Sequence, residues 1–512
     1  MGSNNSKLAP ANKKSNEKPA CATTATMKLK QIASGGGGGG GGGGNLDTHD
    51  EHEAPPPYNA EDRAKSLAIP QLKDWEELLL SSDKNRLAIL SFATNPYSQI
   101  LANQSAVQAV DRPVFNVKIP LEGAPITNQR SSGRCWLFAA TNVFRVPLMK
   151  KYNLKEFELS QAYLFYWDKI EKANWFMEKI IETAEEDLSS RLVQKLLEDP
   201  VTDGGQWDMV ANLVGKYGLV PHDIYPDNFS AQNSAKMNWL VTVKLREHAL
   251  TLRRLAQSQP ERLARQKDDF LKEIHSLVTI MLGPPPSPKE AFHWEYYDAD
   301  GKFQEVYDSP QGFARQASAQ LARGDVDPRR MLSLVNDPRN EYSRLLTVDK
   351  LGNVVGGRPI TYVNVDMKTI KAAAIAMLRA GHPVFFGCDV GKFYDAKLGV
   401  MDQWLLDVRL GFNTTLRMDK AQRLKTGESS MTHAMVLTGV HVEKGQPVRW
   451  RVQNSWGEAV GDKGWFVMAD EWMDEFTYQV VVDSRFVSKE VRDILNQEPE
   501  VLPRWDPMGV LA

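Results

Sequence analysis

The sequence has few cysteines, no long apolar run and almost no net charge. Its three cysteines, Cys21, Cys135 and Cys388, are too few and too scattered for a disulfide framework or a structural zinc site. No uncharged apolar stretch approaches the ~20 residues of a membrane-spanning helix, and no apolar core of a secretory signal is visible near the N-terminus. We therefore expect a cytoplasmic protein without a metal or other cofactor, although a mitochondrial or membrane-associated fraction is compatible with the sequence.

The formal net charge is −2 over 512 residues, so no overall field attracts nucleic acid or an anionic membrane. Basic residues do gather between Val243 and Lys267, within a charge-rich segment that is predicted to be helical from Arg246 to Leu282. Such an excess of Lys and Arg is more typical of the solvated face of a surface helix than of a nucleic-acid site. Nucleic acid is therefore a partner that the charge does not support.

Residues 1–65 are predicted to be a disordered, low-complexity tail. They include ten consecutive glycines at 35–44, and polyglycine carries the largest backbone entropy cost of ordering. The first six residues match the pattern for N-myristoylation of Gly2, or match it by chance in a segment rich in Ser and Asn. A single acyl chain would give only weak membrane association.

The rest of the chain has helical periodicity first and strand periodicity later, which predicts the α+β class. We expect two main parts with an insertion between them. The expected divisions are the tail (1–65), an N-terminal segment and helical part that carries the candidate nucleophile (66–215), a mostly helical insertion (216–358), a β-rich part that carries the candidate base (359–485) and a C-terminal arm (486–512).

Cys135 is the candidate nucleophile because a helix is predicted to begin at this residue. A thiol attacks as the thiolate, and the N-terminus of a helix offers unpaired N–H groups and a positive dipole end that favour the anion. Gln129, six residues earlier, carries an amide that can donate to a developing oxyanion together with the Cys135 N–H. The alternatives are a buried structural cysteine and a loop glutamine that faces water.

His433 and Asn454 are the candidate base and its orienting partner. They lie on or beside two predicted strands, 433–442 and 448–453, that a short turn connects. Hairpin pairing would bring the two side chains together, so that Asn454 accepts the imidazole N–H and turns the other nitrogen toward Cys135. The alternatives are a core histidine and a turn residue at the end of a strand.

Together these residues resemble the papain-like cysteine peptidases. Ser132 stands where secreted members carry a disulfide cysteine, and Cys135 and His433 are 298 residues apart, against the ~130–150 typical of that group. These departures are similar to the bleomycin hydrolase branch. The shared motifs are Gln129, Gly133-Arg134-Cys135-Trp136, Asp203-Gly204-Gly205-Gln206-Trp207, Gly387-Cys388-Asp389, Thr432-His433-Ala434, Asn454-Ser455-Trp456-Gly457 and the end Trp505–Ala512.

The resemblance implies a papain-like fold with a helical part, an antiparallel β-barrel part and a large helical insertion. It also implies a homohexamer whose active sites face an internal channel, with Gly204 and Gly205 lining the substrate cleft. The resemblance further implies a C-terminal arm that lies in that cleft and would make the enzyme an aminopeptidase. Bleomycin deamidation and homocysteine-thiolactone hydrolysis are implied as side activities.

The effect of such an arm also follows from its chemistry. A terminal carboxylate on Ala512 inside the cleft would pair with the ammonium group of a substrate and block longer chains. The alternative is a frayed terminus. Against it, Leu502, Trp505, Met508 and Leu511 are unusually apolar for a solvated tail.

We therefore interpret the chain as a cysteine aminopeptidase that acts on peptides through a thiolate–imidazolium pair. A Cys–His acyltransferase would use the same residues and pass the acyl group to an amine instead of water. A nucleic-acid-binding hexameric scaffold is the alternative from another functional class, and the near-neutral charge argues against it.

Overall fold

The computed structural model describes residues 65–321 and 331–512. The tail predicted over 1–65, with its myristoylation pattern at Gly2, lies outside the described residues except for the last position. The described residues divide into two compact units, one that ends at Ile89 and one that spans Leu90–Ala512. In the first, helix α2 (Ile69–Leu80) has a proline in its first turn, where the missing N–H costs nothing.

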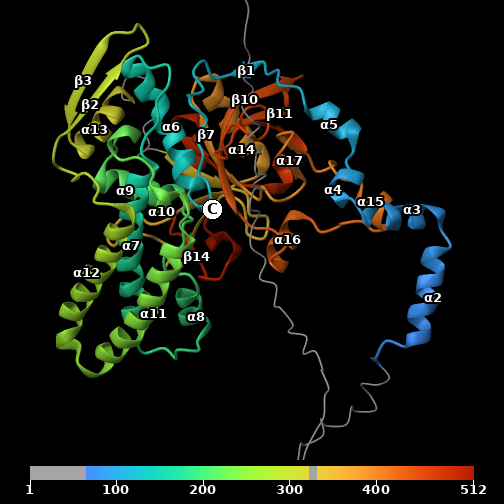
Figure 1. Ribbon diagram of the computed structural model, residues 1–512, viewed down its shortest axis with the longest axis horizontal. Coiled ribbons are helices and arrows are strands. Elements are labelled where there is room, and N and C mark those ends of the chain that lie inside the picture. The colour runs from blue at the N-terminus through green and yellow to red at the C-terminus, as the bar shows by residue number, and fades with distance from the viewer. Residues whose placement is uncertain (1–64, 322–330) are drawn as a thin grey trace, which may run out of the picture. The chain divides into compact units, whose positions relative to one another are not determined.

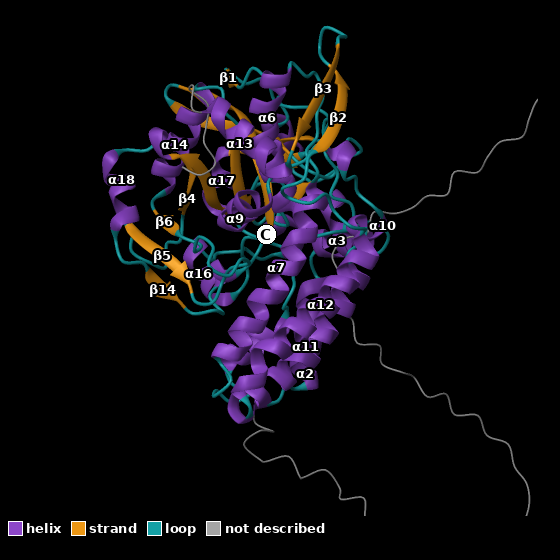
Figure 2. Cartoon of the chain, turned by 90° about the vertical axis from the view of Figure 1, so that its left-hand side faces the viewer, coloured by secondary structure: helices purple, strands orange, loops and turns teal. Residues whose placement is uncertain are grey.

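The described strands of the second unit form one 12-stranded sheet in which most neighbours are antiparallel, plus a separate hairpin of β2 and β3 (Figures 1 and 2). The order in the sheet is β14-β5-β6-β4-β13-β7-β10-β11-β12-β9-β8, and β1 also pairs with β10. The strands are β1 (Val117–Lys118), β2 (Phe292–Tyr297), β3 (Phe303–Asp308), β4 (Met331–Val335), β5 (Arg344–Val348), β6 (Tyr362–Asn364), β7 (Val384–Cys388), β8 (Tyr394–Asp395), β9 (Val400–Met401), β10 (His433–Glu443), β11 (Gln446–Gln453), β12 (Trp465–Ala469), β13 (Thr477–Asp483) and β14 (Glu500–Leu502).

Helices α7, α11 and α12 pack against one another, at the lower left of Figure 1. No described helix is long and apolar enough to cross a membrane. Besides α2, the α-helices are α3 (Asp83–Phe92), α4 (Tyr97–Ile100), α5 (Gln104–Val110), α6 (Cys135–Tyr152), α7 (Gln161–Glu182), α8 (Arg191–Glu198), α9 (Trp207–Tyr217), α10 (Phe229–Gln232), α11 (Ala235–Ser258), α12 (Leu263–Leu282), α13 (Pro310–Leu321), α14 (Met367–Arg379), α15 (Val408–Phe412), α16 (Lys420–Thr426), α17 (Asp470–Phe476) and α18 (Lys489–Asp493).

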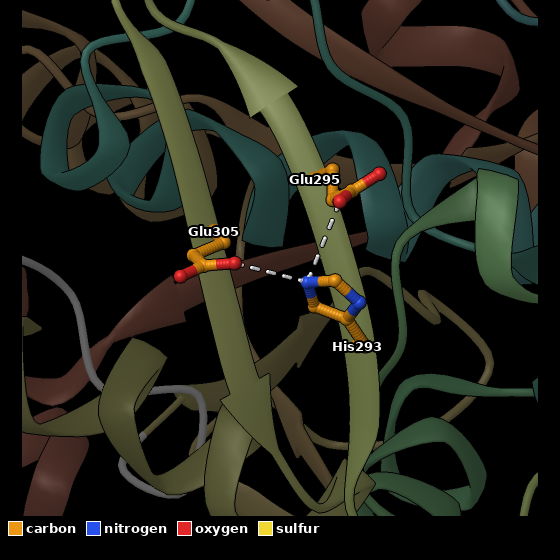
Figure 3. Close-up of side chains that lie close together, drawn as sticks. All are labelled: His293, Glu295 and Glu305. Carbon is orange, nitrogen blue, oxygen red and sulfur yellow. Dashed lines mark hydrogen bonds and ion pairs between the residues drawn. The ribbon is translucent and has the colours of Figure 1, made fainter.

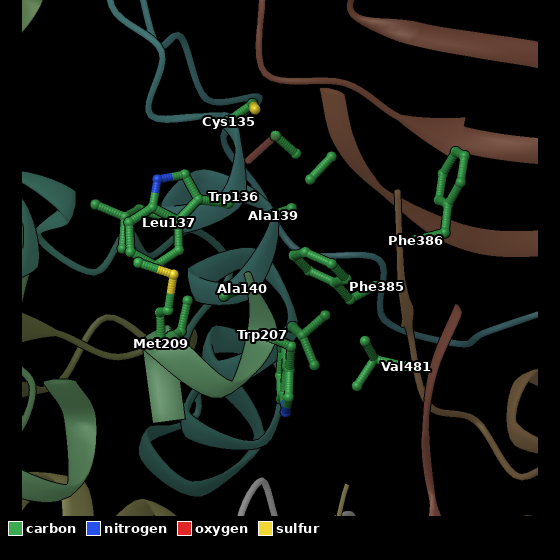
Figure 4. Close-up of a cluster of buried hydrophobic side chains, with 14 of the residues drawn as sticks. Cys135, Trp136, Leu137, Ala139, Ala140, Trp207, Met209, Phe385, Phe386 and Val481 are labelled. Atoms are coloured by element: carbon green, nitrogen blue, oxygen red, sulfur yellow. The ribbon is translucent and has the colours of Figure 1, made fainter. Parts of the chain in front are cut away.

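Within Leu90–Ala512, the helices and the sheet share an apolar core. Helix α6 packs against β10 and β7, and its Trp136 is fully buried (Figure 4). The rings of Trp207 and Phe385, which come from α9 and β7, lie 5.3 Å apart, a separation typical of favourable edge contacts. This core fixes the start of α6 relative to the strand that begins at His433.

The α+β class is confirmed, and local signals explain several element boundaries. Ser160 caps α7 by accepting from Tyr163 N at 3.0 Å, and Gly381 follows α14 with a φ of +83°, as the sequence predicts. The predicted helix over 246–282 is instead two helices, because Pro260 cannot continue α11. The range 216–358 contains strands β2 to β5 as well as its helices.

Candidate active site

Cys135 is the first residue of α6, as the sequence predicts, and only 2% of the residue is exposed. Burial raises the pKa of its thiol to about 11. Hydrogen bonds from the backbone N–H groups of Ala434, Trp136 and Cys135 itself oppose that rise. The helix start therefore stabilises the thiolate, but burial has the larger effect on an isolated charge.

Asp203 holds the loop before Cys135 in place through a hydrogen bond to its backbone. Gly133 N donates to Asp203 Oδ2 at 3.0 Å, and a Cβ on Gly133 would lie 2.9 Å from the Cβ of Asp203. Asp203 Oδ1 accepts from Lys169 Nζ and from Asn238 Nδ2, both at 2.7 Å, while Ser234 donates to Oδ2. These partners hold the pKa of the buried Asp203 carboxyl well below its usual range, with Lys169 the largest favourable influence, although burial alone would raise it.

His433 is the first residue of β10, and Asn454 directly follows the last residue of β11. The imidazole Nε2 lies 2.9 Å from Asn454 Oδ1, and the ring of Trp456 lies 4.9 Å from the imidazole. Because Nε2 is committed to Asn454, Nδ1 is the nitrogen left to exchange a proton with a thiol. Burial lowers the pKa of His433 to about 4, and the hydrogen bond that the imidazole donates to Asn454 only partly offsets this.

The predicted hairpin is confirmed, with an offset in its register. Val436 pairs with Gln453, so Asn454 lies beside Met435, two residues further along β10 than His433. The ladder shifts between Leu437 and Gly439 and again near the turn, where β-bulges interrupt the pairing. His433 and Asn454 therefore meet as diagonal neighbours rather than as a directly opposed pair.

Gln129 is held by the segment that follows Asn454. Its backbone N donates to Ser455 O at 2.8 Å, and the Ser455 hydroxyl donates to Gln129 Oε1 at 2.8 Å. Gln129 Nε2 donates to Ser132 O at 2.8 Å, which leaves a second N–H on that nitrogen. The amide oxygen is thus held by Ser455, and the amide nitrogen keeps one N–H that can donate to another group.

These groups line one cleft of about 450 Å³ together with the end of the chain. Cys135, His433, Gln129, Gly204 and Ala512 all contribute to its surface. A larger cavity of about 940 Å³, between α8, α11 and the arm, contains none of these groups.

The last residues of the chain lie against the glycine pair. Gly205 N donates to Ala512 O at 2.9 Å, and Gln206 Nε2 donates to Val510 O at 3.0 Å. A Cβ on Gly204 would lie 2.7 Å from Leu511 O, so only glycine permits this approach. The structure therefore brings together all seven residues that the sequence analysis selected.

Within the described ranges, one cluster has the donor types of a metal site, and it lies outside the cleft on the β2–β3 hairpin (Figure 3). His293 Nε2 is 3.3 Å from Glu305 Oε2 and 3.8 Å from Glu295 Oε1. All three side chains are exposed. The hydrogen bond between His293 and Glu305 accounts for the arrangement without an ion, so the cluster does not indicate a metal centre.

Sequence similarity agrees with the site. The profile of the Peptidase C1-like family matches residues 66–509. The chain belongs to this family. It is 42% identical to "Cysteine proteinase 1, mitochondrial" of Saccharomyces cerevisiae, covering 88% of this chain and 94% of the relative, and 44% identical to "Bleomycin hydrolase" of Homo sapiens, covering 82% and 93%. The crystal structure of PepW from Lactobacillus rhamnosis is similar with a TM-score of 0.83 at 39% identity, covering 88% of this chain and all of that one.

Membership in the Peptidase C1-like family confirms the cysteine-type peptidase and its papain-like fold. Two residues that hold the candidate site in place were given no role in the sequence analysis. Ser455 orients Gln129, and its only signal was its position directly after Asn454. Asp203 ties the nucleophile loop to the cleft wall, and its signal was its position before the glycine pair.

Proposed function

We propose that this peptidase is an aminopeptidase in which Cys135 is the nucleophile and His433 the base. Asn454 orients the imidazole, and the oxyanion is held by Gln129 and the Cys135 N–H. The observation that carries the proposal is that the Cys135 cleft also contains Ala512. A peptidase whose cleft is filled on one side can accept only the end of a substrate.

The proton must pass from the Cys135 thiol to His433 before attack. Burial disfavours each charge by itself, which is why the thiol pKa is raised and the imidazole pKa lowered. Transfer between the two groups creates opposite charges side by side, with no net charge to desolvate and with mutual attraction that a low dielectric strengthens. The pair therefore ionises as a unit, and its apparent pKa values belong to both groups together.

The reaction then follows from the positions of the donors. The thiolate attacks the carbonyl carbon of the first residue, and the oxygen takes up negative charge beside Gln129 Nε2 and the Cys135 N–H. The imidazolium of His433 protonates the leaving amine, and neutral His433 later deprotonates the water that hydrolyses the thioester. Indole packing by Trp456 keeps bulk water from the His433–Asn454 hydrogen bond.

We assign the selection of the N-terminal residue to the C-terminal arm (486–512). Leu511 and Ala512 occupy the cleft beside Gly204, where a longer substrate would place the residue that precedes the one whose carbonyl is attacked. A terminal carboxylate on Ala512 would pair with the substrate ammonium in surroundings that contain little water, which strengthens a charge-assisted bond. Peptides are therefore the proposed substrates, and bleomycin deamidation and homocysteine-thiolactone hydrolysis are proposed as side activities.

The proposed assembly is a homohexamer in the cytoplasm. The mitochondrial label on the yeast relative supports a mitochondrial fraction as well. Weak membrane association would require acylation of Gly2, and nucleic acid is not proposed as a partner. Sedimentation of the purified protein tests the assembly, since a hexamer of a 57.5 kDa chain is readily separated from a monomer.

The deciding experiment compares two cysteine variants on aminoacyl-coumarin substrates. Cys135→Ser should abolish turnover and the rapid labelling by iodoacetamide, with the fold intact by circular dichroism. Cys388→Ala is the matched control, since Cys388 is a second buried thiol on β7, and it should keep both. Turnover by Cys135→Ser comparable to that of the unmodified protein would refute the assignment, and acyl transfer to an added amine in place of hydrolysis would indicate an acyltransferase.

A further inference from the structure

The cleft carries a carboxylate that the proposed mechanism does not use. Asp199 follows the last residue of α8 and lines the same cleft as Cys135 and Ala512. Its side chain is exposed, and it forms no hydrogen bond or ion pair with another residue in the described parts of the chain. Its charge acts at longer range on the buried guanidinium of Arg504.

Asp203, the other acidic side chain of the cleft, is not available to a ligand in the same way. Its two oxygens already accept four hydrogen bonds, and the ammonium of Lys169 balances its charge. Asp199 is therefore the side-chain carboxylate that a cationic group entering the cleft can still engage.

An unpaired acceptor on the facing helix points to the same chemistry. Asn238 of α11 also lines the cleft, and its Nδ2 is committed to Asp203. Asn238 Oδ1 is buried from solvent and has no hydrogen-bond partner among the described residues. Because an unsatisfied buried acceptor is costly, a donor supplied by a ligand would be stabilising at this position. No Lys or Arg side chain is among the described residues that line the cleft.

The geometry of the proposed reaction directs one substrate group toward these acceptors. The scissile carbonyl lies at Cys135 and Gln129, and the ammonium lies toward Ala512 beside Gly204. The side chain of the first residue must then lie along the remaining wall of the cleft. The lining residues that the proposed reaction leaves without a role include Gly133, Asp199, Thr202 and Asn238.

We propose that Asp199 is a specificity residue that favours peptides whose first residue carries a long cationic side chain, arginine or lysine. The inference rests on the proposed aminopeptidase function and names its substrate class. A guanidinium reaching Asp199 gains a charge-assisted hydrogen bond, and its remaining N–H groups suit an amide oxygen such as Asn238 Oδ1. The carboxylate is exposed, so solvent limits the preference to about five- to tenfold.

The test uses the full-length protein and two coumarin substrates of the same shape, arginyl and citrullyl, of which only the first is charged. The unmodified enzyme should show a kcat/KM for arginyl that is about five- to tenfold above citrullyl, and the ratio should fall as salt is raised. Asp199→Asn should bring the ratio close to one and leave citrullyl turnover within about twofold. Asp199→Glu should retain most of the preference.

The matched control is Glu198→Gln, which removes the neighbouring carboxylate that pairs with Lys195 and does not line the cleft. It should leave the ratio unchanged. An arginyl-to-citrullyl ratio that is the same in Asp199→Asn and the unmodified enzyme would overturn the inference while leaving the aminopeptidase intact. Absence of turnover on every aminoacyl substrate by the unmodified enzyme would instead refute the proposed function.

Discussion

The hydroxyl of Ser455 donates to the side-chain oxygen of Gln129 at 2.8 Å, and this contact decides which end of the Gln129 amide can meet a substrate. An isolated glutamine can turn its oxygen or its nitrogen toward the cleft, and only the nitrogen stabilises an oxyanion. The segment that carries Asn454, the proposed orienting partner of His433, thus also orients Gln129, the proposed oxyanion donor.

Ser455→Ala should lower kcat by about three- to tenfold, because the amide loses its orientation but not its donor. Gln129→Ala should lower kcat further, by about 100-fold, with KM nearly unchanged. Adding Ser455→Ala to Gln129→Ala should then cost little, because both changes affect one interaction. Steady-state kinetics on the four proteins checks this, and fully additive losses would show that Ser455 acts elsewhere.

Asn454→Ala should slow the enzyme less than His433→Ala does. The base is required for proton transfer, whereas its partner fixes only the ring and the tautomer. Measurement of kcat/KM for both variants decides the ranking. The reverse order would reassign the two roles.

Folding stability should depend on pH through His433. In the resting fold, with the Cys135 proton still on sulfur, burial lowers the pKa of His433 from 6.5 to about 4, so between these values the unfolded chain binds more protons and stability declines as pH falls. Over this window, protonation of His433 in the unfolded chain lowers the free energy of unfolding by about 3 kcal/mol, at 1.36 kcal/mol per pKa unit. Urea unfolding at pH 6.5 and pH 4.5 should show a smaller loss in His433→Gln than in the unmodified protein. Equal losses would mean that His433 does not remain neutral in the fold.

Removal of residues 509–512 should relax cleavage from one residue at a time toward internal bonds. Gly204→Ala should act in the same direction, because the added methyl carbon would lie 2.7 Å from Leu511 O and 2.9 Å from Ala512 O. Gly215→Ala in α9 is the control, since its Cβ would meet no atom within 4 Å. Mass spectrometry of products from a peptide with a blocked N-terminus gives the readout. Continued failure of the truncated enzyme to cut that peptide would show that the arm does not select the N-terminus.

The sequence was sufficient to predict the α+β class, the start of a helix at Cys135 and the hairpin that unites His433 with Asn454, because each depends on local periodicity or on a short turn. It did not predict the register offset, because the turn is centred between Lys444 and Gly445, one residue beyond the midpoint of His433 and Asn454, and the two shifts in the ladder cancel. Strands β4 and β5 were missed for a different reason. Their parallel partners, β6 and β14, lie far along the chain, and no local pattern specifies such pairing.

The arrangement around Asp203 and Gly133 has a consequence for the chemical environment in which the enzyme can work. Secreted members of the superfamily hold this region with a sulfur–sulfur cross-link, and here Ser132 replaces one of the cysteines. The hydrogen bonds and the ion pair of the Asp203 carboxylate with Gly133 N–H and the Lys169 ammonium are not broken by thiols, whereas a disulfide is. Reductants can therefore keep the Cys135 thiol reduced without breaking the contacts that hold the loop beside it.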